Sequence, residues 1–151
     1  MAFITLTQAK AHLRIDGSDE DTDLTLKIAA AERAATEYLQ CNVYADAPAL
    51  ATAIAAVPAT LAAAKVTYDA AYLVAIAMTD TDLSLIEQAQ AMSVYMRAVY
   101  DATRTRQGVV INELIQSAML LILGYLHESR EDGTEIPRAA QDLLSPFRCY
   151  A

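Results

Sequence analysis

The sequence predicts an all-α protein. We expect a compact bundle of a short N-terminal helix, a long amphipathic helix, a central buried helix and a short C-terminal helix, with an inserted Ala-rich helical hairpin. Hydrophobic residues make up 55% of the 151 residues, Gly and Pro number only four each, and apolar residues recur at spacings of three and four. We expect a single domain, whose core is residues 1–41 and 112–151 and whose helical insertion spans about 42–111.

The first two helices have clear start signals. Thr5 followed by Gln8 fits a capping box, which predicts a short helix over 6–13. A Gly-Ser pair then breaks the chain, and the carboxylates within 19–23 lie where the positive end of a helix dipole favours them. The apolar face of this second helix continues to about residue 40 and consists of Leu24, Ile28, Ala31, Ala35, Tyr38 and Leu39.

The middle of the chain is rich in alanine. Pro48 and Pro58 each suit the first turn of a helix, so we expect a short helix over 48–56 and a longer one over 58–78. An Asp at position 80 or 82 then caps a helix that continues to about residue 104. The apolar residues of this helix follow helical spacing: Leu85, Ile86, Ala89, Met92, Met96, Val99 and Tyr100. Met92 and Met96 with Tyr95 and Tyr100 form either a core stripe, which helical spacing favours, or a partner groove.

The last long helix should be the buried centre of the fold. Asn112 is a good cap, and the helix it starts runs to about residue 131, with apolar residues over more than half its circumference. Pro137 fits the first turn of a final short helix to about residue 144, and Pro146 prevents its continuation. The chain ends in a short segment, 147–151, that carries two aromatic rings and one cation.

Charge and composition exclude several functional classes. A formal net charge of -8 opposes binding to nucleic acid phosphates. No signal peptide is visible, and the longest strongly apolar run, 118–123, is far shorter than the roughly 20 residues that span a bilayer, so we expect a soluble protein without membrane contact. Cys41 and Cys149 lack metal-binding or redox spacing, so we expect free thiols in a reducing cytoplasm.

The possible chemical sites are weak. The acidic stretch 19–23 imitates a calcium loop, yet Leu24 stands where glycine is needed and Ala30 stands where a bidentate Glu is needed. His127 and Glu131 are one helical turn apart, but the local sequence supplies no third metal ligand. No nucleophile or phosphate-loop motif is present. We therefore expect no enzyme activity, no catalytic residue, no metal and no cofactor.

Two features suggest association with other proteins. Thin helices with 55% hydrophobic residues leave apolar patches exposed on a monomer, and such patches usually mark interaction surfaces. Arg97 and Arg104 are seven residues apart on one helical face, where they either pair with acidic groups or remain solvated. From the residues alone, the best class is an acidic, all-helical, self-associating protein.

The two ends of the chain resemble a known family. The opening run ITLTQAKAHLRID at 4–16 is followed by the acidic step Asp19 to Asp21, and the closing half carries YLHESRE at 125–131, Ile136-Pro137 and LSPFR at 144–148. These motifs, in this order, resemble the head-tail connector (adaptor) family of tailed bacteriophages typified by gp6 of phage HK97. The resemblance covers roughly the first and last forty residues.

The resemblance implies a structural virion protein, assembled in the host cytoplasm and located at the head-tail interface. Such proteins form a ring, here of about twelve copies, beneath the portal protein, extend the DNA channel, help to retain packaged DNA and contact the next neck or tail protein. DNA passes through without specific binding. The alternative is a non-viral helical scaffold or a regulatory protein-binding module.

Under this resemblance we assign interaction roles to two groups of residues. The C-terminal segment supplies candidates for docking on the portal: Phe147, Arg148 and Tyr150. Opposite charges at two helices supply candidates for contacts between subunits: Asp19, Glu20, Asp21, Arg97 and Arg104.

Overall fold

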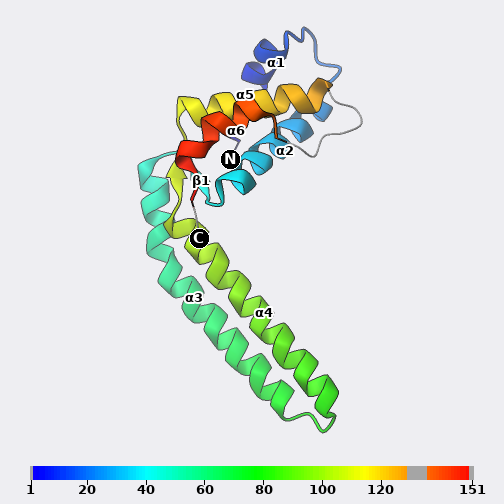
Figure 1. The fold of residues 1–151 in the computed structure, drawn as a ribbon, viewed down its shortest axis with the longest axis vertical. Helices are drawn as coiled ribbons and strands as arrows, with labels where there is room; N and C mark the ends of the chain where they lie inside the picture. Colours follow the sequence, from blue (N-terminus) through cyan, green and yellow to red (C-terminus); the bar gives the residue numbers. More distant parts are fainter. Residues whose placement is uncertain (1, 129–135, 150–151) are drawn as a thin grey trace. The chain divides into compact units, whose positions relative to one another are not determined.

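The computed structural model describes residues 2–128 and 136–149, and their fold is all-α apart from two very short strands (Figure 1). The predicted fold class is confirmed. The chain divides into two compact units, one of Met1–Ala47 with Gly108–Ala151 and the other of Pro48–Gln107. The first unit contains α1 (Leu6–Leu13), α2 (Asp21–Leu39), β1 (Val43–Tyr44), β2 (Val109–Val110), α5 (Glu113–Glu128), α6 (Arg138–Leu144) and the 3-10 helix η1 (Ser145–Phe147).

Local caps set the start of α1 and of α5. Thr5 Oγ1 accepts a hydrogen bond from the backbone N–H of Gln8 at 3.2 Å, and Gln8 Oε1 accepts one from the backbone N–H of Thr5 at 2.9 Å. This reciprocal pair is the predicted capping box. Before α5, Asn112 Oδ1 accepts a hydrogen bond from the backbone N–H of Ile115 at 2.9 Å. Both cap predictions are confirmed.

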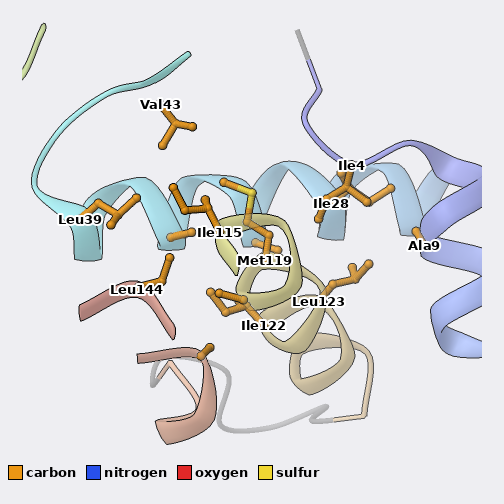
Figure 2. Close-up of a cluster of buried hydrophobic side chains, with 14 of the residues drawn as sticks. Ile4, Ala9, Ile28, Leu39, Val43, Ile115, Met119, Ile122, Leu123 and Leu144 are labelled. Carbon is orange, nitrogen blue, oxygen red and sulfur yellow. The ribbon is translucent and has the colours of Figure 1, made fainter. Parts of the chain in front are cut away.

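The core of the first unit forms around α5, which packs against α2 on one side and α6 on the other. Figure 2 shows Ile115 and Met119 of α5 lying against α2, with Leu144 of α6 close by. The predicted central helix is therefore confirmed as the buried centre. The fully buried larger side chains are Ile4, Leu24, Leu39, Ile115, Met119, Leu123, Leu144 and Cys41.

The N-terminal segment is fixed to this core through backbone hydrogen bonds. Glu32 Oε1, on α2, accepts hydrogen bonds from the backbone N–H groups of Phe3 at 2.5 Å and Ile4 at 2.8 Å. Gln116 Nε2, on α5, donates to the carbonyl oxygen of Phe3 at 2.9 Å. Because these polar groups are satisfied, the buried side chain of Ile4 can pack into the core.

A short parallel strand pair, which the sequence did not predict, joins two distant parts of the first unit. Val43 pairs with Val109 and Tyr44 with Val110. The backbone N–H of Val109 donates to the carbonyl oxygen of Asn42 at 2.9 Å, and that of Ile111 donates to Tyr44 at 2.8 Å. Two-residue strands have no periodic signal, so only the pairing across the fold defines them.

The second unit is a hairpin of two long helices, α3 (Ala47–Ile76) and α4 (Thr81–Arg106), drawn side by side in Figure 1. The prediction of separate helices over 48–56 and 58–78 is wrong, because α3 continues through Pro58. Proline removes one backbone donor, but the rest of the helix supplies enough hydrogen bonds to continue on both sides. Asp80 caps α4, since its Oδ1 accepts a hydrogen bond from the backbone N–H of Leu83 at 3.0 Å.

The buried residues of α4 are small or polar, and those of α3 are Val57 and Ala75. Ala75 of α3 and Ser84 and Ala91 of α4 are buried, whereas many larger side chains of both helices are exposed. The rings of Tyr68 and Tyr95 contact across the hairpin with centroids 5.4 Å apart.

The helix α3 contains a longer apolar stretch than the sequence analysis expects. By length and composition α3 could cross a membrane, because an 18-residue window has a mean hydropathy of 1.7. The longest apolar stretch is thus not 118–123. Alanines raise the mean hydropathy of α3 without forming a run of large apolar residues, and only 6% of that window is buried.

Candidate interaction surfaces

The acidic step lies at the start of α2 and is only partly exposed. Asp21 is the first residue of α2 and forms an ion pair with Lys10 of α1. Lys10 Nζ also donates to the carbonyl oxygen of Gly17 at 2.7 Å, which ties α1 to the turn before α2. Asp19 and Glu20 are exposed. The structure therefore gives Asp21 a role within the subunit and presents the other two carboxylates on the surface.

The C-terminal segment is attached to the end of α2. The backbone N–H of Cys149 donates to the carbonyl oxygen of Leu39 at 2.9 Å. The guanidinium carbon of Arg148 lies 5.0 Å from the ring centroid of Tyr38, at cation-π distance. Phe147 packs against the hydrophobic core. This segment is part of the folded unit, so its deletion would disturb the core as well as any surface contact.

The three portal-docking candidates therefore differ. Arg148 is exposed, and Phe147 is half-buried against the core. Tyr150 lies outside the described residues. A test of this surface should change Arg148, because a change at Phe147 would mix a loss of stability with a loss of binding.

The two arginines that share a face of α4 also have different environments. Arg97 is exposed, whereas Arg104 is only 8% exposed and its guanidinium carbon lies 5.7 Å from the ring centroid of Tyr100. Of the two alternatives for this face, pairing with acidic groups or solvation, solvation does not hold for Arg104. Helical spacing predicted their common direction, but burial depends on neighbours that the spacing cannot show.

Several large apolar side chains of α4 are exposed. Leu85, Ile86, Met92, Met96 and Tyr100 are between 42% and 63% exposed. The prediction of a core stripe is wrong for Met92, Met96 and Tyr100, whereas Tyr95 packs against Tyr68 of α3. The residues of α4 that are buried are smaller or polar, namely Ser84, Ala91, Ala102 and Arg104. An apolar stripe that is exposed to solvent usually marks a surface that contacts another protein.

A groove lies between α3 and α4 within the hairpin. Its walls include Ala64, Tyr68 and Ala71 of α3 and Ala91 and Val94 of α4. The walls are mostly apolar, and within the described ranges 2–128 and 136–149 no group of three His, Cys, Asp or Glu side chains is placed to hold a metal ion.

Across the described residues, the fold is all-helical apart from one short strand pair, and its exposed apolar and charged side chains are the candidate interaction surfaces. A family model described as phage gp6-like head-tail connector protein matches residues 3–81. This range covers α1, α2, β1 and α3, which is more than half of the chain, and it ends at the first residue of α4. The chain belongs to the phage gp6-like head-tail connector family.

Family membership makes the protein a structural component of the phage particle, at the head-tail interface, that contacts other head and tail proteins. The closing motifs at 125–148 lie outside the matched range. Searches of curated proteins and of solved structures found no match.

Proposed function

We propose that this protein forms a ring under the portal that connects the phage head to the tail or neck. The observation that carries the proposal is the match of residues 3–81 to the connector family. A ring of about a dozen copies would match the symmetry of a portal, and a closed ring requires two different surfaces on each copy. Exposed apolar side chains on both helices of the hairpin supply candidate surfaces.

In this function the ring extends the DNA channel and helps to retain the packaged genome. The formal net charge of -8 suits a wall along which DNA slides, because clustered cations would bind its phosphates and hinder ejection. DNA therefore passes through the ring without being bound specifically.

The ring would contact the portal on one side and the next neck or tail protein on the other. The candidate portal contact is the C-terminal segment, in which Arg148 is the exposed cation. Arginine is among the residues that contribute most to protein interfaces. The exposed charges of Asp19, Glu20 and Arg97 are candidates for contacts between subunits, whereas Asp21 and Arg104 are engaged within one copy.

The test is reconstitution with the cognate portal. Purified full-length protein is mixed with portal rings, and native mass spectrometry measures how many copies bind to each portal. We expect a complex with one defined ring of this chain per portal. In parallel, particles that lack the protein should package DNA and then lose it, and addition of purified protein should restore retention.

The family match does not favour a non-viral helical scaffold or a regulatory binding module, which is the alternative that the composition alone leaves open. Either would share the composition and the exposed hairpin surface. A chain that neither binds portals nor changes DNA retention would favour this alternative and overturn the connector proposal.

A further inference from the structure

The two cysteines of the chain lie close together in the first unit, although they stand in distant parts of the sequence. Cys41 comes two residues after the end of α2, and Cys149 belongs to the C-terminal segment after η1. The backbone N–H of Cys149 donates to the carbonyl oxygen of Leu39 at 2.9 Å. This hydrogen bond places Cys149 beside the stretch of chain that contains Cys41.

The two thiols converge on one acceptor. Cys41 Sγ lies 4.0 Å from the carbonyl oxygen of Phe147, and Cys149 Sγ lies 3.8 Å from the same oxygen. The two sulfur atoms are therefore no farther apart than the sum of these distances. Both cysteines are free thiols in the structure. Because they come from distant segments, only the tertiary fold brings their sulfur atoms together.

The two thiols differ in their access to solvent. Cys41 is 0% exposed, whereas Cys149 is half-buried. A reagent in solution therefore meets the sulfur of Cys149 first. An accessible thiol with a second thiol next to it is the usual arrangement at redox-sensitive sites, where the second thiol displaces whatever has reacted with the first.

We infer that Cys41 and Cys149 form a disulfide when the protein enters an oxidising environment, and that this bond fastens the C-terminal segment to the end of α2. A component of the phage particle meets both conditions, because the host cytoplasm keeps thiols reduced and the medium around a released particle does not. The inference goes beyond the proposed function and does not depend on a ring or on the portal.

The oxidant in this reaction is a small disulfide such as oxidised glutathione. The thiolate of Cys149 attacks one sulfur of the small disulfide, whose S–S bond breaks and releases one small thiolate. The thiolate of Cys41 then attacks the Cys149 sulfur of the mixed disulfide, and the second small thiolate leaves. The protein gives up two electrons and two protons. The small disulfide takes up both and becomes two thiols, so the reaction balances.

The geometry lets the bond form without moving the two segments apart. A disulfide joins its sulfur atoms at about 2.0 Å, and a change of the χ1 rotamer moves a cysteine sulfur by about 3 Å. The hydrogen bond from Cys149 to Leu39 holds the segments side by side during this change. The carbonyl oxygen of Phe147 loses only thiol donors, which are weak.

The bond would secure a segment that is already in its native position. Phe147 packs against the core, and the guanidinium carbon of Arg148 lies 5.0 Å from the ring centroid of Tyr38. The loop that the bond closes contains the hairpin, α5 and α6. Cross-links that close long loops restrict the unfolded chain most, so oxidation should stabilise the folded protein.

The first test follows the thiols of the reduced full-length chain after addition of oxidised glutathione. Alkylation and mass spectrometry count the remaining thiols, and a digest without reductant identifies linked peptides. We expect both thiols to disappear within a monomer, a linked peptide pair that contains Cys41 and Cys149, and reversal by dithiothreitol. A wild-type chain that keeps both thiols, stops at a stable glutathione adduct or forms disulfide-linked dimers would overturn the inference.

Two single variants test the order of the steps, with circular dichroism as a check on their folding. Cys41→Ala should stop at a glutathione adduct of Cys149, because the second thiol is absent. In Cys149→Ser, the buried Cys41 should react at least about tenfold more slowly than Cys149 does in the wild type. Equal rates would refute the assignment of Cys149 as the first thiol to react. The wild-type measurement does not depend on either variant.

The second test compares the thermal unfolding of oxidised and reduced protein. The oxidised wild type should unfold at a midpoint about 5–10 °C higher, because the cross-link restricts the unfolded chain. Cys149→Ser is the matched control, and oxidised glutathione should leave its midpoint unchanged. An oxidised wild type that unfolds at no higher temperature than the reduced form would contradict the inference, since the folded state would then oppose the bond. Neither test involves the portal, so a failure of the proposed function would leave both results unaffected.

Discussion

The carboxylate of Glu32 accepts a hydrogen bond from the backbone N–H of Ile4 at 2.8 Å, and the side chain of Ile4 is 1% exposed. One carboxylate on α2 thus holds the extended N-terminal segment against the core. The same oxygen accepts a second hydrogen bond, from the backbone N–H of Phe3. The position of Ile4 in the core therefore depends on a charged acceptor.

Glu32→Ala should lower the free energy of unfolding by about 2–3 kcal/mol, because two backbone donors lose a charged acceptor. Glu32→Gln should lower it less, since the amide oxygen can still accept. Urea unfolding followed by circular dichroism measures both values. Arg33→Ala, at an exposed position of the same helix, is the control, and an equal loss there would contradict the assignment.

Asn112→Ala should destabilise the first unit by about 1 kcal/mol, because the backbone N–H of Ile115 loses the side-chain oxygen that caps α5. Asn112→Asp keeps an acceptor at this position and should preserve stability. Thermal unfolding of the two variants gives the comparison. Equal stability of the Ala and Asp variants would show that the cap contributes nothing.

Pro58→Ala should stabilise the hairpin by up to about 3 kcal/mol, since alanine restores a backbone donor inside α3. Pro48→Ala is the matched control, because Pro48 lies in the first turn, where the backbone N–H has no partner within the helix. Thermal scans at 222 nm should show a higher midpoint for Pro58→Ala only. A similar shift in both variants would point to an effect on the unfolded chain.

Arg148→Ala should weaken portal binding without a large change in stability, because the Arg148 side chain is exposed. Surface plasmon resonance on immobilised portal measures the affinity, and we expect about a tenfold loss. Arg138→Ala removes another exposed cation, on α6, and should bind normally. Unchanged binding of Arg148→Ala would remove the C-terminal segment from the portal contact.

Local signals in the sequence determined the helices of the first unit. The cap at Thr5 and the apolar face of α2 depend on residues three or four apart, so the sequence alone predicts them. The strand pair depends on Val43 meeting Val109, and no local pattern specifies a contact across that distance.

The hairpin was harder to predict for two physical reasons. A proline such as Pro58 usually ends a helix, and only the surrounding structure shows that α3 continues. The stripe at Leu85 and Met92 has helical spacing, which a core stripe and an interface stripe share. The small residues Ser84 and Ala91 occupy the buried face instead. Only the structure shows that this face of α4 is the one that α3 covers.

The pairing of Val43 with Val109 limits how this chain can evolve. Parallel strands cannot be joined by a tight turn and need a crossover of about a dozen residues or more. The stretch between β1 and β2 can therefore be shortened by deletion down to such a crossover, but not removed, while the strand pair remains. Gain or loss of whole helical turns in α3 and α4 together would change the length of the hairpin and leave the strand pair of the first unit unchanged.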